Sequence, residues 1–178
     1  MIFKIKDIDL ELVQGDIASQ KDMEAVVNAA NAELKIGGGV AGAVHRAAGP
    51  ELEKACRPLA PIKPGEAVIT EAFKLPNKYV IHTLGPVYGR DKPEAEILAR
   101  AYKNSLKLAS ENRIKTIAFP AISTGAFAYP HNDAAEVSLQ TIKEMAAELK
   151  NINTIRFVLY SKKDFNIYQK AAEKILKQ

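Results

Sequence analysis

The chain has 178 residues and a formal net charge of +4, with 25 lysine and arginine residues against 21 aspartate and glutamate residues. Hydrophobic residues make up 47% and charged residues 26%, the balance of a soluble globular protein, which excludes a disordered or fibrous chain. The single cysteine, Cys56, excludes an internal disulfide and a cysteine-based zinc site. We interpret it as a small helix residue and not as a reactive thiol.

No stretch of the sequence resembles an export signal or a membrane span. Residues 1–7 carry charges where a signal peptide needs an apolar stretch. The longest uncharged run, residues 116–132, contains Pro120, Gly125 and Pro130 and falls short of the ~20 apolar residues of a spanning helix. We therefore expect a cytoplasmic protein without a membrane partner.

Short runs of β-branched, aromatic or other apolar residues predict strands along the whole chain. Several of these runs, such as residues 25–27 and 117–119, are apolar on consecutive positions, as expected when both faces of a sheet are covered. The predicted strands are residues 2–5, 10–13, 25–28, 67–70, 79–83, 116–119 and 154–160.

Amphipathic segments between the strands predict helices. One extends to about Asn112, with Asp91 as its cap and Pro93 at its start. A second follows the capping-box pattern of residues 133–136, and Asp164 is the expected cap of the last helix. Strands that alternate with helices predict a single α/β domain over residues 1–178, built as a three-layer sandwich.

A glycine-rich segment at residues 26–49 interrupts the regular strand–turn–helix pattern. A buried strand delivers Asn28, an irregular loop carries Asn31, and three glycines at 37–39 open a helix. Glycines at a helix start allow close approach of a ligand, and the free N–H groups and helix dipole favour an anion. The glycine spacing also spells G-x-G-x-x-G, but the dinucleotide-binding motif follows its strand directly and this one does not. A flexible loop without a ligand is the alternative.

A second irregular segment, residues 117–130, also leaves a strand and enters a helix. Ser123, Thr124 and the backbone N–H groups of residues 125–127 are placed to cradle a phosphate. Phe127 either anchors this loop on the core or packs against a sugar, and the sequence favours neither. Two such loops at neighbouring strand ends predict a pocket for a diphosphate between two apolar or sugar groups. Binding through backbone amides needs no metal or cofactor, and we expect none.

Five motifs in this order make the chain resemble the macro domain, the ADP-ribose-binding module, over nearly its whole length. They are residues 15–17 (Gly-Asp-Ile), 27–31 (Val-Asn-Ala-Ala-Asn), 37–40 (Gly-Gly-Gly-Val), 80–86 (Val-Ile-His-Thr-Leu-Gly-Pro) and 120–125 (Pro-Ala-Ile-Ser-Thr-Gly). The segment His45-Arg-Ala-Ala-Gly-Pro50 looks most like the MacroD-type branch, whose members hydrolyse ADP-ribosyl esters. The resemblance implies a mixed, mostly parallel central sheet.

The resemblance also implies a role for each matched position. Asp16, with the Ile17 backbone beside it, would accept a hydrogen bond from the adenine amino group, and Tyr160 would stack on the adenine. Asn31 would hold the distal ribose and orient the attacking water, and Phe127 would fix that ribose. His45 would either assist the water or be an ordinary helix residue. The implied ligand-binding residues are Asp16, Ile17, Asn28, Gly37, Gly38, Gly39, Val40, Ser123, Thr124, Gly125, Ala126, Phe127 and Tyr160, and the implied catalytic residues are Asn31, His45 and Phe127.

Two positions depart from the family pattern. MacroD-type enzymes commonly have aspartate in the pattern Gly-Gly-Gly-Val-Asp-Gly, where this chain has Ala41. A non-catalytic reader of ADP-ribose is therefore the alternative to a hydrolase. The second loop has Ala128 where the family has glycine, which costs roughly 1 kcal/mol if a left-handed conformation is required and predicts a shifted loop.

The implied partners are ADP-ribose itself, ADP-ribosylated proteins and O-acetyl-ADP-ribose. The basic charge permits a nucleic acid, but the lysines and arginines are scattered, so we do not expect one as the main partner. A monomer is expected. His82, within an apolar strand, is interpreted as structural, and His131 as an exposed residue at a helix start.

Overall fold

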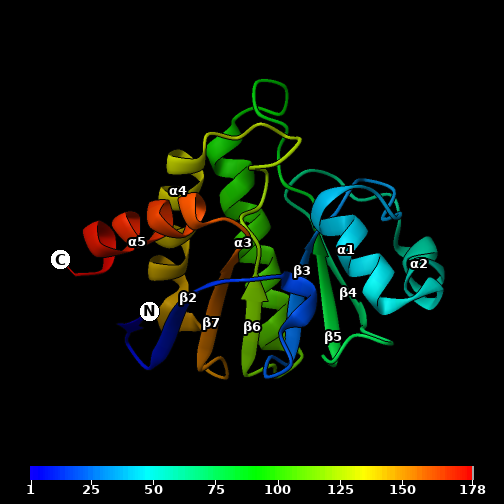
Figure 1. Ribbon diagram of the computed structural model, residues 1–178, viewed down its shortest axis with the longest axis horizontal. Coiled ribbons are helices and arrows are strands. Elements are labelled where there is room, and N and C mark those ends of the chain that lie inside the picture. Colours follow the sequence, from blue (N-terminus) through cyan, green and yellow to red (C-terminus); the bar gives the residue numbers. More distant parts are fainter. Residues whose placement is uncertain (178) are drawn as a thin grey trace.

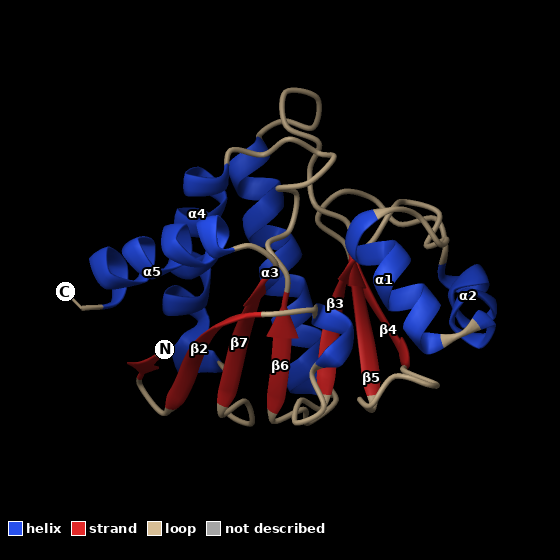
Figure 2. Ribbon diagram, viewed as in Figure 1, coloured by secondary structure: helices blue, strands red, loops and turns tan. Residues whose placement is uncertain are grey.

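A twisted sheet of seven strands runs through the middle of the computed structural model, which describes residues 1–177 (Figures 1 and 2). The strands lie in the order β1-β2-β7-β6-β3-β5-β4. Their bounds are β1 Ile2–Ile5, β2 Ile8–Gln14, β3 Ala25–Ala29, β4 Ala67–Glu71, β5 Tyr79–Thr83, β6 Thr116–Phe119 and β7 Thr154–Leu159. The predicted strands are all present, with ends that differ by a few residues.

Helices cover both faces of this sheet. α3 (Glu94–Glu111), α4 (His131–Met145) and α5 (Lys162–Leu176) form one apolar core with it, and α1 (Gly39–Ala48) and α2 (Pro50–Cys56) form the other. Three short 3-10 turns are η1 Ile17–Ser19, η2 Arg57–Leu59 and η3 Ala146–Glu148. The three-layer α/β/α sandwich is confirmed. No helix within residues 1–177 combines the length and the apolar character needed to cross a membrane.

The five central strands run parallel, and the two edge strands run against them. β2, β7, β6, β3 and β5 pair in parallel, whereas β1 pairs with β2 and β4 with β5 in antiparallel fashion. The sheet is thus mixed and mostly parallel, as expected. Because parallel strands end at the same edge, the loops that follow β2, β3, β6 and β7 leave the sheet side by side.

Helix starts differ from the predictions because the expected capping groups have other partners. α3 begins at Glu94, and the Asp91 carboxylate accepts a hydrogen bond from the Val87 N–H at 2.8 Å instead of capping the helix. α5 begins at Lys162, where the Ser161 hydroxyl is the cap. The 133–136 pattern lies within α4, which starts at His131, and not ahead of it.

His82 lies at the centre of a buried polar cluster, as its interpretation as structural requires. Its side chain is fully buried, with Nδ1 3.1 Å from Asn28 Nδ2 and Nε2 3.0 Å from the Thr70 hydroxyl. Cys56 is also buried, with its Sγ 3.7 Å from His82 Nε2. Burial lowers the pKa of His82 to about 3 and raises the pKa of Cys56 to about 11, so both side chains are neutral at physiological pH.

We predict that acid destabilises the protein partly through His82. The ordinary histidine pKa is 6.5, so His82 is protonated below that pH in the unfolded chain. In the folded chain it stays neutral down to about pH 3. Stability is therefore intact above pH 6.5 and falls as the pH drops through this window, by roughly 2 kcal/mol between pH 7 and pH 5. Urea unfolding at both pH values, with His82→Gln as the comparison, checks this. Identical pH slopes for the two proteins would contradict it.

Candidate ligand-binding site

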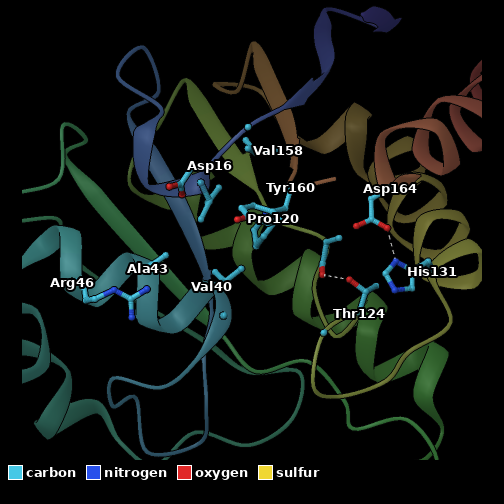
Figure 3. A pocket seen from close by; sticks show the side chains of 15 residues that line it. Asp16, Val40, Ala43, Arg46, Pro120, Thr124, His131, Val158, Tyr160 and Asp164 are labelled. Carbon is cyan, nitrogen blue, oxygen red and sulfur yellow. Dashed lines mark hydrogen bonds and ion pairs between the residues drawn. The ribbon is translucent and has the colours of Figure 1, made fainter. Parts of the chain in front are cut away.

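A cavity of about 650 Å³ opens at the edge where the parallel strands end (Figure 3). Its volume falls in the range of sites that enclose a small molecule. It is lined by the segment after β2, by one face of α1, by the loop after β6 and by the ends of β7, α4 and α5. The lining residues are Gly15, Asp16, Ile17, Gly39, Val40, Ala43, Arg46, Pro120, Ala121, Thr124, Gly125, His131, Val158, Tyr160 and Asp164.

An exposed carboxylate and an exposed aromatic ring both lie at one end of the cavity. Asp16 caps η1, where its Oδ1 accepts a hydrogen bond from the Ala18 N–H at 2.9 Å. Tyr160 follows β7 and is 85% exposed. The Gly15 N–H donates to the Leu159 carbonyl at 2.9 Å, which ties the two strand ends together. A flat group with a hydrogen-bond donor on its edge fits between these side chains.

The start of α1 forms the middle of the cavity and requires its glycines. Gly39 has a φ of +52°, in the left-handed region that glycine tolerates. A Cβ on Gly42 would overlap the Gly37 carbonyl oxygen, so only glycine lets this loop pass close to the helix. The helix has no side-chain cap at Gly38, which leaves its first N–H groups available to an anion.

Asn31 closes the loop in front of these glycines. Its Nδ2 donates to the Lys35 carbonyl at 2.8 Å, and its Oδ1 accepts from the Lys35 N–H at 3.0 Å. A Cβ built on Gly37 would lie 3.2 Å from Asn31 Nδ2, so the amide sits beside the first glycine. Because an amide has a second N–H and a second lone pair, Asn31 retains one donor and one acceptor for a ligand.

The loop after β6 forms the opposite wall and keeps a left-handed turn in spite of Ala128. Ala128 has a φ of +59°, and its N–H donates to the Gly125 carbonyl at 2.9 Å. Alanine therefore adopts the strained left-handed conformation itself, and the position of this loop relative to that of related proteins stays a prediction. Phe127 is half-buried against the core beneath α1, which supports its interpretation as a loop anchor.

His131 and Asp164 form a pair on the far side of the cavity. His131 Nδ1 lies 2.6 Å from Asp164 Oδ1, so the first turns of α4 and α5 are joined there (Figure 3). His131 is half-buried by this contact, and not simply exposed as the sequence suggested. The pair was missed because 33 positions separate its members.

Arg46 also lines the cavity. It was not predicted from the sequence, although its spacing along the helix could have indicated it. It follows Val40 and Ala43 at intervals of three residues, which places all three on one face of α1.

Two predicted site residues lie away from the cavity. The Asn28 side chain is fully buried and bonds to His82, its neighbour in the parallel register of β3 and β5. His45 is 4% exposed and lines a smaller cavity of about 280 Å³ together with Ile36 and Glu53. Burial lowers the pKa of His45, so its imidazole is neutral at physiological pH.

The structure brings about half of the predicted binding residues to the cavity wall. Those that line it are Asp16, Ile17, Gly39, Val40, Thr124, Gly125 and Tyr160. Asn31, Gly37, Gly38, Ser123, Ala126 and Phe127 belong to the same two loops without lining it. The arrangement offers a carboxylate and an aromatic ring at one end and backbone N–H groups next to them, which suits a ligand with an aromatic end and an anionic middle.

Comparison with known proteins identifies the family. The macro domain family model matches residues 27–138. The chain belongs to the macro domain family. A macro domain-containing protein of Chlorobaculum tepidum is 49% identical over 91% of this chain and 94% of its own length. A Salmonella typhimurium relative, named O-acetyl-ADP-ribose deacetylase, is 47% identical over 89% of this chain and 91% of its own.

Solved structures agree with the sequence relatives. The Oceanobacillus iheyensis macrodomain, solved with ADP, superposes on this macro domain with a TM-score of 0.95 at 40% sequence identity. The match covers 99% of this chain and 96% of the other. The similarity thus extends over both the sheet and the loops that build the cavity.

We predict that Ala128→Gly stabilises this macro domain by roughly 0.5–1 kcal/mol. Glycine relieves about 1–2 kcal/mol of left-handed strain in the folded protein, and this gain exceeds the free-energy cost of the greater conformational entropy that glycine gives the unfolded chain. Ala126→Gly, in the same loop but without a positive φ, should lower stability by a similar amount. Chemical denaturation of both variants measures the difference. Equal effects of the two substitutions would refute the strain at Ala128.

Proposed function

We propose that this macro domain binds ADP-ribose in the 650 Å³ cavity. The observation that carries the proposal is the order of groups along the cavity wall: the Asp16 carboxylate and Tyr160 ring, then the open N-terminus of α1. This order matches a nucleobase followed by a diphosphate. The ADP in the Oceanobacillus structure and the deacetylase name of the Salmonella relative support the same ligand class.

The cavity residues divide among the parts of this ligand. Asp16, Ile17 and Tyr160 hold the adenine. Backbone N–H groups of Gly39 and Val40, with those of the loop after β6, hold the diphosphate. Asn31 and Phe127 belong to the same two loops outside these diphosphate contacts, and we assign them to the distal ribose.

We further propose hydrolysis of ADP-ribosyl esters on acidic side chains and of O-acetyl-ADP-ribose. A water oxygen bonds to the anomeric carbon or to the ester carbonyl carbon, and a carbon–oxygen bond of the ester breaks. The proton lost by the water passes to the leaving oxygen, with the substrate's own phosphate as the base. Asn31 orients the water with the donor and acceptor that its contact with Lys35 leaves available.

His45 has no direct step in this proposal. Its ring is buried and neutral and lines the smaller cavity, and the centroid of the His82 ring lies 6.4 Å away from it. We assign it to the packing that supports α1.

A reader that binds without turnover is the second candidate, and Ala41 favours it. This residue is apolar and 6% exposed in the first turn of α1, where an aspartate would offer a carboxylate to the water. The two candidates share one cavity and differ in whether the ester bond breaks. In either case we propose a monomeric cytoplasmic protein whose partners carry ADP-ribose.

A time course separates the two candidates. The protein is incubated with a partner mono-ADP-ribosylated on glutamate or aspartate, and separately with O-acetyl-ADP-ribose, and free ADP-ribose and intact substrate are both measured. Release faster than in a control without protein establishes a hydrolase. Substrate that stays intact but is retained by the protein establishes a reader.

We predict that Asn31→Ala lowers turnover by roughly 100-fold while ADP-ribose affinity falls much less, because water orientation matters chiefly in the transition state. Lys35→Ala is the matched control, since Asn31 contacts only the Lys35 backbone and that contact survives. Steady-state kinetics and calorimetry measure the two effects. Parallel losses of affinity and turnover would count against a role in orienting the water.

We also predict that Gly42→Ala lowers ADP-ribose affinity roughly ten-fold, or about 1.4 kcal/mol. The new Cβ must displace the Gly37 carbonyl and with it the loop at the start of α1. Gly38→Ala should bind normally, because its Cβ meets no atom within 4 Å and its φ of −86° suits alanine. Titration calorimetry compares them. Equal affinities would show that the glycine loop does not contact the ligand.

A further inference from the structure

A partly buried chain of hydrogen bonds supports the turn that presents Asp16. The side chain of Gln20, which is 8% exposed, donates from Nε2 to the Asp16 carbonyl at 2.8 Å. Its Oε1 accepts from Arg156 Nη1 at 2.9 Å. The amide therefore links the backbone of Asp16 to a charged side chain on the central sheet.

Arg156 is itself held on several sides. It lies opposite Glu11 in the register of β2 and β7, and its Nε donates to Glu11 Oε2 at 2.6 Å. Its Nη1 and Nη2 donate to the two oxygens of Asp22 at 2.8 and 2.7 Å. A guanidinium bound by two carboxylates in a fork geometry has little freedom to rotate.

This cluster lies beneath the floor of the cavity. Side chains alternate along a strand, so Arg156 shares a face of β7 with Val158, which lines the cavity. A Cβ built on Gly15 would lie 3.8 Å from both Gln20 Nε2 and Val158 Cγ1. The Gln20 amide is thus packed directly under the segment that carries Asp16.

The chain of bonds has a fixed direction. A guanidinium can only donate and a carbonyl can only accept, so the Gln20 amide satisfies both partners in one orientation alone. On the other side, Asn77 Nδ2 donates to the carbonyls of Gln20 and Met23, each at 2.7 Å. The η1 turn is therefore held from both sides, which fixes the position and orientation of the Asp16 carboxylate in the cavity.

We propose that Gln20 and Arg156 are positioning residues that set the base specificity of the cavity. The inference rests on the proposed binding of ADP-ribose. Asp16 Oδ1 is occupied by the Ala18 N–H, so Oδ2 is the oxygen that accepts from an exocyclic amino group of the base. Hypoxanthine has a carbonyl in that place and is repelled by the carboxylate. Discrimination between the two bases depends on where Oδ2 sits, which Gln20 and Arg156 determine.

The test is calorimetric titration of the full chain with ADP-ribose and with inosine diphosphate ribose. The parent protein should prefer ADP-ribose. Gln20→Met keeps the side-chain length but removes the hydrogen bonds to the Asp16 carbonyl and to Arg156. It should lower ADP-ribose affinity about five-fold, the effect of losing the one hydrogen bond between the base and Asp16. The affinity for the inosine compound should change little. The measured quantity is the ratio of the two affinities, which a general loss of structure would leave unchanged.

Two further variants isolate the cause. Gln20→Glu keeps an acceptor for Arg156 but lacks the N–H that binds the Asp16 carbonyl, so the ratio should fall as in Gln20→Met. Ser138→Ala is the control for lost stability: it removes a buried hydroxyl from α4, on the opposite face of the sheet, and should leave the ratio intact.

The outcomes separate this inference from the proposed function. A parent protein that binds neither nucleotide overturns both. A parent that binds the two nucleotides equally, or Gln20 variants that weaken both in the same proportion, overturn the positioning role and leave ADP-ribose binding in place.

Discussion

Parallel pairing of β7 with β2 on one side and β6 on the other brings three strand ends to one edge of the sheet. The cavity walls that follow these three strands depend on this register. The segment after β2 presents Asp16, the loop after β6 presents Thr124, and the end of β7 presents Tyr160. Burial of both sheet faces by helices makes such a sheet stable, so the same apolar packing that folds the chain also assembles the site.

The polar side chains inside the molecule support this architecture more than they perform chemistry. His82 is neutral and bonded to Thr70 and Asn28, which satisfies groups that would otherwise be costly to bury. Arg156 is satisfied by Glu11 and Asp22. The Arg156 cluster joins β2 and β7, from whose ends the segments that carry Asp16 and Tyr160 depart. The His82 cluster joins β3, β4 and β5 inside the molecule.

Unusual backbone conformations shape two of the cavity walls. Glycine at positions 39 and 42 lets the chain turn and pass closely where a side chain would strain or overlap. In the opposite loop, Ser123 and Ala128 adopt positive φ values although both carry a Cβ. Backbone strain of this kind persists where the surrounding structure holds it, and it gathers at binding sites. The loop keeps its shape at a cost in stability that a glycine would avoid.

Apolar patterns and short motifs were enough to predict the strands, most of α3, α4 and α5, the glycine loop and the family. Apolar periodicity and glycine conformation are properties of neighbouring residues, so they are legible without a structure. The motifs around Asp16, Gly37 and Gly125 identify the family for the same reason, because each is a short run of consecutive residues.

The contacts between polar groups could not be predicted from the sequence, because they depend on how the elements pack. The tertiary structure paired His131 with Asp164 and Gln20 with Arg156, residues that are 33 and 136 positions apart. Asn28 bonds to His82 and does not line the cavity, and His45 lines a different cavity. Asp91 accepts a hydrogen bond from a loop N–H and does not cap the helix. A hydrogen-bonding side chain takes whichever donor or acceptor folding brings within about 3 Å, and that distance is set by the packing of the whole sheet and its helices.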